Sequence, residues 1–162
     1  MKNDHKKSSD FQPLENEANF PPSVDKEVVG GMHIAPECIT RKNNQFVMVE
    51  WPNGLPRHDS ERTVRFPHGL MKFGETIEAC AKRLVKKQIG AKLKSSRILY
   101  LDSYVDDNNH WHLEPWVLVE LSGDFNLPKE AEKVHYFKNE KDLPEDSLWS
   151  REEFKSLIID YF

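Results

Sequence analysis

The sequence predicts an α/β sandwich, an α+β arrangement built on a mixed β-sheet. β-rich runs occupy residues 28–66, interrupted by one loop, and return after residue 95. Between them the hydrophobic pattern changes at Thr76 from β-type runs to the period of a helical face, and a second amphipathic segment closes the chain. The order of strands, helix, strands and helix is typical of helices packed on a sheet.

The first β-rich runs, VVGGMHIAPECIT and QFVMVEW, flank the turn residues RKNN, so we expect a β-hairpin. WPNGLPRHDSERT is rich in proline and charge and is expected to be a loop, and TVRF returns briefly to strand character. Residues 1–27 are polar and contain prolines, which favours a flexible N-terminal arm before a domain at 28–162.

Residues 76–89 are expected to form an amphipathic helix that stops at Gly90. Its predicted inner face consists of Ile77, Cys80, Ala81, Leu84, Val85 and Gln88. SRILYLDSYV, HWHLEPWVLVELS and VHYF read as later strands, with a DDNN turn after the first, and residues 151–161 as the closing helix.

Composition limits the classes of function. The 162 residues, 38% of them hydrophobic, are enough for one sizeable core, and the net charge of −4 disfavours general binding to nucleic acid or anionic membrane. Cys38 and Cys80 lie far apart and are expected to be buried thiols in a reducing compartment. Because no apolar stretch suits a secretory signal or a membrane span, we expect a cytoplasmic protein.

The stretch FPHGLMKFGETIEACAKRLVKKQIGA, residues 66–91, carries the most specific motif. Gly69, five residues, Glu75, seven residues, Arg83 and then Gly90 have the spacing of the Nudix box. Pro67, Gly74 and Ala81 also stand where that motif commonly has these residues. Over residues 28–162 the chain therefore resembles the Nudix (nucleoside diphosphate linked to another moiety) hydrolase family, which implies a Nudix-like α/β/α sandwich.

The resemblance also implies a chemistry that the box residues of this chain do not supply. In the family, glutamates at three helical positions hold Mg²⁺ or Mn²⁺ against a diphosphate, because hard cations need anionic oxygen ligands. Here those positions are Leu84, Lys87 and Gln88, and Lys72 stands where the family often has a further glutamate. We therefore expect a degenerate Nudix box with no bound metal, and Leu84 packed in the core.

The framework of the box remains. Glu75 and Arg83 match the family's glutamate and arginine, and an ion pair between them would brace the loop against the helix. Glu75 and Glu78 are candidate catalytic acids only if activity persists. Acids elsewhere are alternative metal ligands, although such residues are more often solvated charges: Glu50, Asp106, Asp107, Glu114 and Glu120. His110 and His112 alternate on a strand and share a face, but they are too few for a metal site.

Two functions are consistent with the sequence. The first is a binding domain without metal-dependent pyrophosphohydrolase activity, whose ligand is a nucleotide, another phosphate-bearing molecule or a protein. In it Lys72, Arg83, Lys87 and Gln88 would meet the ligand, and no cofactor is needed. The alternative is a divergent hydrolase of a nucleoside diphosphate derivative that uses Mg²⁺ or Mn²⁺ and acids outside the box, which carboxylates converging near Leu84 and Gln88 would favour. Some of the four tryptophans, Trp51, Trp111, Trp116 and Trp149, are candidates for stacking on a base.

Overall fold

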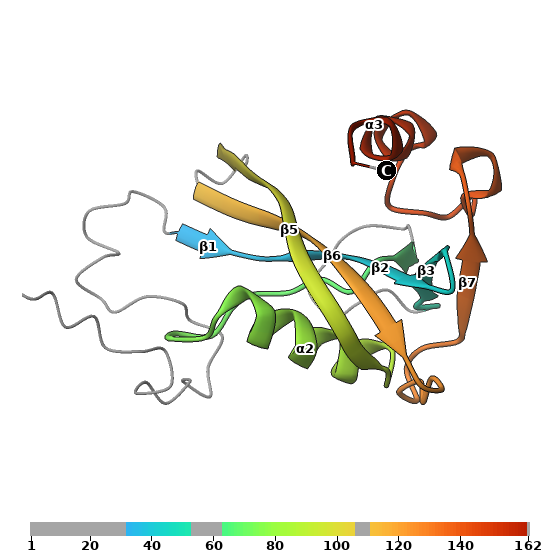
Figure 1. Ribbon diagram of the computed structural model, residues 1–162, viewed down its shortest axis with the longest axis horizontal. Helices are drawn as coiled ribbons and strands as arrows, with labels where there is room; N and C mark the ends of the chain where they lie inside the picture. The colour runs from blue at the N-terminus through green and yellow to red at the C-terminus, as the bar shows by residue number, and fades with distance from the viewer. Residues whose placement is uncertain (1–31, 53–62, 106–110, 162) are drawn as a thin grey trace, which may run out of the picture.

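The computed structural model describes residues 32–52, 63–105 and 111–161. Within these ranges a mixed sheet of seven strands forms the middle layer (Figure 1). The strands are β1 (Met32–Ile34), β2 (Glu37–Lys42), β3 (Gln45–Glu50), β4 (Val64–Arg65), β5 (Lys92–Val105), β6 (Trp111–Ser122) and β7 (Lys133–Phe137). The expected N-terminal arm and most of the expected loop after Trp51 lie outside the described residues, as do Asp106, Asp107 and His110.

The sheet is mixed because β6 pairs in parallel with β1 and β2, whereas its partner on the other edge, β5, is antiparallel. On the far side of β2, β3 pairs antiparallel with β2, β4 and β7. The predicted hairpin is confirmed for β2 and β3, whose turn contains Asn43 and Asn44 at φ 52° and 61°. Asparagine tolerates this left-handed backbone better than most side chains.

One strand is broken where the sequence analysis expected a continuous run. β1 and β2 are separated by Ala35 and Pro36, yet both pair with β6 in one continuing register, Ile34 opposite Leu113 and Glu37 opposite Trp116. Proline has no backbone N–H to donate to the ladder, which explains the interruption. The interruption leaves Glu37 as the first residue of β2.

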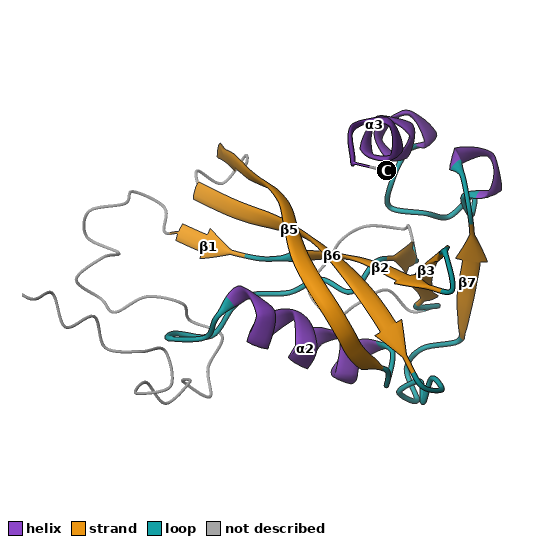
Figure 2. Ribbon diagram, viewed as in Figure 1, coloured by secondary structure: helices purple, strands orange, loops and turns teal. Residues whose placement is uncertain are grey.

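Two helices cover opposite faces of the sheet (Figure 2). α2 (Ile77–Gln88) packs on one face, where its residues Cys80, Ala81, Leu84 and Val85 join a buried core with β2, β3 and β6. α3 (Arg151–Tyr161) packs on the other face through Phe154 and Leu157, after a short 3₁₀ helix, η2 (Glu140–Asp142). The α/β/α sandwich predicted from the sequence is therefore the observed architecture.

The ends of α2 follow from its sequence. Thr76 is the N-cap, and its Oγ1 accepts a hydrogen bond from the Ala79 N–H at 3.1 Å. After the helix, the Gly90 N–H returns to the carbonyls of Val85 and Lys86, with Gly90 at φ 69°. None of the described helices has the length and apolar character needed to cross a membrane.

Candidate functional site

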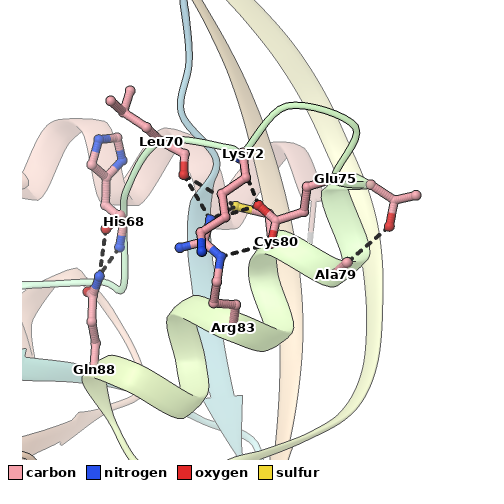
Figure 3. A network of polar contacts seen from close by, with 9 residues as sticks. His68, Leu70, Lys72, Glu75, Ala79, Cys80, Arg83 and Gln88 are labelled. Atoms are coloured by element: carbon pink, nitrogen blue, oxygen red, sulfur yellow. Dashed lines mark hydrogen bonds and ion pairs between the residues drawn. The ribbon is translucent and has the colours of Figure 1, made fainter. Parts of the chain in front are cut away.

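The predicted brace between the box loop and α2 is present (Figure 3). Arg83 donates to both carboxylate oxygens of Glu75, from Nε to Oε1 at 2.8 Å and from Nη2 to Oε2 at 2.7 Å. The same Nη2 reaches the Leu70 carbonyl at 2.9 Å, and the Lys72 N–H donates to Glu75 at 2.9 Å. This geometry fixes the loop on the helix by charge-assisted hydrogen bonds.

The pKa of Glu75 reflects the same contacts. Burial alone would raise this pKa, because it disfavours a charged carboxylate. The hydrogen bonds from Arg83 and from the Lys72 backbone outweigh burial, so the pKa of Glu75 lies below its ordinary value. Glu75 is therefore an ionised structural carboxylate.

The three helical positions at which the family has glutamates are occupied here by Leu84, Lys87 and Gln88. Leu84 is buried, and a Cβ atom placed on Gly69 would lie only 2.9 Å from Leu84 Cδ2. Gln88 is buried and clamps the box loop: its Nε2 donates to the His68 carbonyl at 2.7 Å, and its Oε1 accepts from the His68 N–H at 3.2 Å (Figure 3). Lys87 is exposed.

These residues do not fit the divalent metal that the fold family implies at this place. Leu84 offers no ligand atom, the Gln88 amide is used on both sides by the His68 backbone, and the Lys87 ammonium would repel a cation. The box therefore provides a folded framework without the ligand set.

On the outer side of α2 an open groove of about 490 Å³ is lined by Ala79 and by the basic residues Lys82, Arg83, Lys86 and Lys87. Of the four residues predicted to bind a ligand, Arg83 and Lys87 thus lie together here. Lys72 and Gln88 do not line the groove. Glu78, the second candidate acid, is exposed on the first turn of α2.

A second polar cluster lies beside the box loop on the sheet. His68 Nδ1 is 2.9 Å from Glu37 Oε2 and 3.8 Å from Glu114 Oε1. Glu37 is buried, at 4% exposed, and the side chains of Glu114 and His68 keep 17% and 23% of their surface. Two carboxylates thus converge on the residue whose backbone is held by Gln88.

The crowding of these groups changes their protonation. Burial, and then the charge of Glu37, raise the pKa of Glu114 to about 7. Burial would lower the pKa of His68, but its hydrogen bond with Glu37 and the two carboxylate charges outweigh burial and raise this pKa. Both shifts have the same cause, two carboxylates packed against a single imidazole in a partly buried site.

Sequence reasoning found only Glu114 of this cluster, and only as one of several alternatives whose expected state was a solvated charge. That expectation is wrong for Glu114, because its side chain is largely buried between neighbours. Glu37 and His68 were missed. A charged residue inside the apolar run APECIT was a signal for Glu37, whereas nothing in FPHG alone marks His68 as the partner of distant acids.

The other candidates have ordinary partners. Glu50 accepts from His135 Nε2 at 2.6 Å and pairs with Lys133, and Glu120 pairs with Arg41 at 3.5 Å. The ring of His112 stacks on Tyr104, with ring centroids 4.8 Å apart.

Both cysteines are buried thiols, as predicted, and burial raises the pKa of Cys80 to about 12 and that of Cys38 well above its ordinary value.

The tryptophans divide between core and surface. Trp51 is buried in the core under α2, and Trp149 in the core under α3. Trp116 packs against Trp149, with ring centroids 4.4 Å apart, and Trp111 is exposed at the start of β6. The Trp149 Nε1–H donates to Glu37 Oε1 at 3.2 Å, so this ring supports the polar cluster from the core side.

Comparisons with known proteins identify the architecture. A MutT NUDIX hydrolase from Burkholderia pseudomallei superposes with a TM-score of 0.60 at 16% identity, over 81% of this chain and 98% of that one. The Escherichia coli ORF135 protein gives 0.61 at 12% identity, over 79% and 91% of the two chains. A Bacillus subtilis pyrophosphohydrolase gives 0.54 at 19% identity, over 83% and 73%. No protein-family model and no curated protein sequence matches the chain.

Proposed function

From the Nudix fold that the chain shares with these hydrolases, we propose that it is a binding domain for a nucleotide or another phosphate-bearing small molecule, and that metal-dependent pyrophosphohydrolase activity at its box has been lost. The observation that carries this proposal is that two of the three box positions at which the family has metal-binding glutamates, 84 and 88, hold side chains with structural contacts. Leu84 packs beneath Gly69, and Gln88 is fully engaged by the His68 backbone.

The basic groove on α2 supports a phosphate ligand. Lys82, Lys86 and Lys87 are exposed and line one open groove together with Arg83, so their ammonium groups can reach a ligand bound there. Ammonium groups donate charge-assisted hydrogen bonds to phosphate oxygens and so supply charge neutralisation that a metal gives in the hydrolases. Arg83 is held by Glu75, so we assign ligand contact to the three lysines and a supporting position to Arg83.

The test is a thermal-shift screen of the full chain with nucleoside diphosphates, nucleotide sugars and pyrophosphate, each with and without Mg²⁺. A ligand at ten times its dissociation constant adds about 1.4 kcal/mol to the free energy of unfolding, which raises the melting temperature. We expect at least one compound to stabilise the chain without Mg²⁺. Replacing Lys82, Lys86 and Lys87 together by Gln should weaken the binding of that compound at least about tenfold, because the loss of even one charge-assisted bond removes about 1.5 kcal/mol.

The matched control replaces three exposed lysines outside the groove, Lys138, Lys141 and Lys155, by Gln. This triple variant has the same change in net charge and should bind as the wild-type chain does. Equal losses in both triple variants would assign the binding to net charge and contradict the groove. No shift with any compound would contradict this small-molecule proposal and leave a protein as the ligand.

A second candidate function is supported by one specific observation. Glu37 and Glu114 converge on the side chain of His68, whose backbone is held by Gln88, so two acids outside the box lie beside the box loop. A divergent Nudix hydrolase that cleaves a nucleoside diphosphate derivative would use such acids. Release of phosphate or nucleotide from the same panel in Mg²⁺ or Mn²⁺, abolished by Glu114→Gln, would favour this function over the binding domain.

A further inference from the structure

The strongest unassigned feature of the described residues is the cluster of Glu37, His68 and Glu114. Each residue offers one ligand atom, and the three atoms lie within 4.8 Å of one another. Ligand atoms about 2.1 Å from a tetrahedral ion lie roughly 3.4 Å apart. The separations of 2.9 Å and 3.8 Å from His68 Nδ1 fall on either side of that spacing, and the third pair of atoms lies within 4.8 Å, so side-chain rotations can bring all three onto one cation.

The backbone brings the three residues together before any ligand arrives. Glu37 forms an isolated β-bridge with His68, and the Cys38 N–H donates to the Pro67 carbonyl at 2.9 Å. Glu37 also lies opposite Trp116 in the parallel pairing of β2 with β6, and Glu114 is two residues earlier on β6, on the same face. Two of the three ligands, Glu37 and Glu114, thus stand on strands, which position metal ligands more accurately than loops do, and the bridge ties His68 to the first of them.

Each ligand residue is also held by an outer partner. The Trp149 Nε1–H donates to Glu37, the Tyr104 hydroxyl hydrogen-bonds Glu114, and the Gln88 side chain clamps the backbone of His68. Such outer contacts orient the ligands of metal sites and raise their affinity. The three residues are therefore oriented as the ligands of a metal site are, and not as a mobile ion pair on the surface.

The local charge also calls for a cation. Three carboxylates interact at this place: those of Glu37, Glu114 and Asp102. The positive groups that face them are the Arg65 guanidinium and the His68 imidazole. A divalent ion bound between His68 Nδ1 and the two carboxylates would neutralise this negative charge more effectively than the imidazole alone.

We propose that Glu37, His68 Nδ1 and Glu114 bind one divalent transition-metal cation, with Zn²⁺ favoured over Mg²⁺. The imidazole ligand decides the class, because nitrogen ligands suit Zn²⁺ and its neighbours whereas Mg²⁺ prefers an all-oxygen octahedron. Three protein ligands are the number found in zinc sites that keep one position open for water or a substrate atom. The site is separate from the box positions 84, 87 and 88, and it does not depend on the phosphate-binding proposal.

The experiment titrates the full chain, stripped of metal with a chelator, with ZnCl₂ and separately with MgCl₂ in a calorimeter. We expect one Zn²⁺ per chain and at least about 100-fold weaker Mg²⁺ binding. Glu114→Gln and Glu37→Gln should each weaken Zn²⁺ at least about tenfold, since loss of a mere outer-shell contact already costs 10–100-fold. Substituting Co²⁺ gives a second readout, because its visible spectrum should show His68 nitrogen ligation that disappears in His68→Gln.

The matched control is Glu120→Gln, on the same strand β6 and outside the cluster, which should bind Zn²⁺ as the wild-type chain does. Circular dichroism establishes that each variant is folded, and if buried Glu37→Gln fails to fold, the partly exposed Glu114→Gln decides the matter. Absence of Zn²⁺ binding by the folded wild-type chain would overturn the proposal. Equal Zn²⁺ affinity in wild type, Glu114→Gln and Glu120→Gln would overturn it as well, by placing the ion elsewhere.

Discussion

At the scale of single residues, the brace between Arg83 and Glu75 gives the first prediction. The side chain of Glu75 is only 7% exposed, and it receives two hydrogen bonds from the guanidinium. Glu75→Gln should lower the free energy of unfolding by about 2 kcal/mol, the loss typical of hydrogen bonds to a charged group. Urea denaturation measures this change.

The control for the brace is Glu78→Gln, three residues along, which removes an exposed glutamate from the first turn of α2. It should cost only about 0.3–1 kcal/mol, through the lost interaction with the helix dipole. Equal costs for the two variants would contradict a brace at Glu75.

The pH dependence of the brace has a definite sign. The pKa of Glu75 is lowered in the folded chain, so its contribution is fully present above the unfolded pKa of glutamate, about 4.3. The contribution is lost as pH falls through the folded pKa. The stability difference between wild type and Glu75→Gln should therefore be constant near neutral pH and shrink below about pH 4.

The residue scale also explains what sequence reasoning could and could not find at the site. Glu75 and Arg83 are eight residues apart on one loop and helix, so their pairing followed from local geometry. Glu37, His68 and Glu114 come from three distant segments, and they meet only because β2 pairs in parallel with β6 and bridges to residue 68. Parallel pairing of distant strands leaves no local signature in the sequence.

At the scale of elements, the end of α2 gives a further prediction. Gly90 has φ 69°, and a Cβ atom there would lie 1.9 Å from the Asn126 carbonyl oxygen. Gly90→Ala must therefore move backbone as well as adopt a left-handed conformation. We expect it to lower the free energy of unfolding by more than about 2 kcal/mol, measured by thermal and urea denaturation.

Gly123 is a close control, because its φ of 73° is nearly the same but a Cβ there would meet nothing within 4 Å. Gly123→Ala should cost only the left-handed backbone term, about 1–2 kcal/mol. A Gly90→Ala variant no less stable than Gly123→Ala would show that the contact with Asn126 is absent in solution.

Elements with a strong period were predictable and weakly patterned ones were not. The expected helices at 76–89 and 151–161 match α2 and α3, with Thr76 and Ile89 as the caps of α2. β5 begins at Lys92, four residues before the expected strand, because its first residues KLKS are mostly exposed on an edge and carry no strong apolar alternation. The expected strand TVRF is observed only as the two residues of β4, because its pairing with β3 extends over just those two residues.

At the scale of the whole molecule, the sheet separates two hydrophobic cores. The core under α2 contains Leu84 and Val85, and the core under α3 contains an aromatic cluster: Phe46, Phe66, Phe137, Trp149 and Phe154. The polar cluster at Glu37 is tied to the second core through Trp149. Successive side chains of β2 and β3 point to opposite faces of the sheet and so pack in opposite cores. Because both cores depend on the same strands, we expect them to unfold together.

Phe154 tests this dependence. Its ring is completely buried and meets Phe46 at 4.8 Å and Phe137 at 5.0 Å between centroids. Phe154→Ala should lower the free energy of unfolding by about 3–5 kcal/mol, and Leu84→Ala in the opposite core by about 2–5 kcal/mol, because each leaves a cavity. Ile159→Ala, at a residue 70% exposed on the same helix as Phe154, should change stability by less than about 0.5 kcal/mol.

If one sheet joins the two cores, tryptophan fluorescence and far-ultraviolet circular dichroism should report the same denaturation midpoint in wild type, Phe154→Ala and Leu84→Ala. Trp51 lies in the first core and Trp149 in the second, so fluorescence follows both sides of the sheet. A fluorescence transition that separates from the circular dichroism transition in Phe154→Ala alone would mean that α3 and its core unfold as an independent unit. In that case the Trp149 contact with Glu37 would open before the rest of the fold, and the polar cluster would be the least stable part of the sheet.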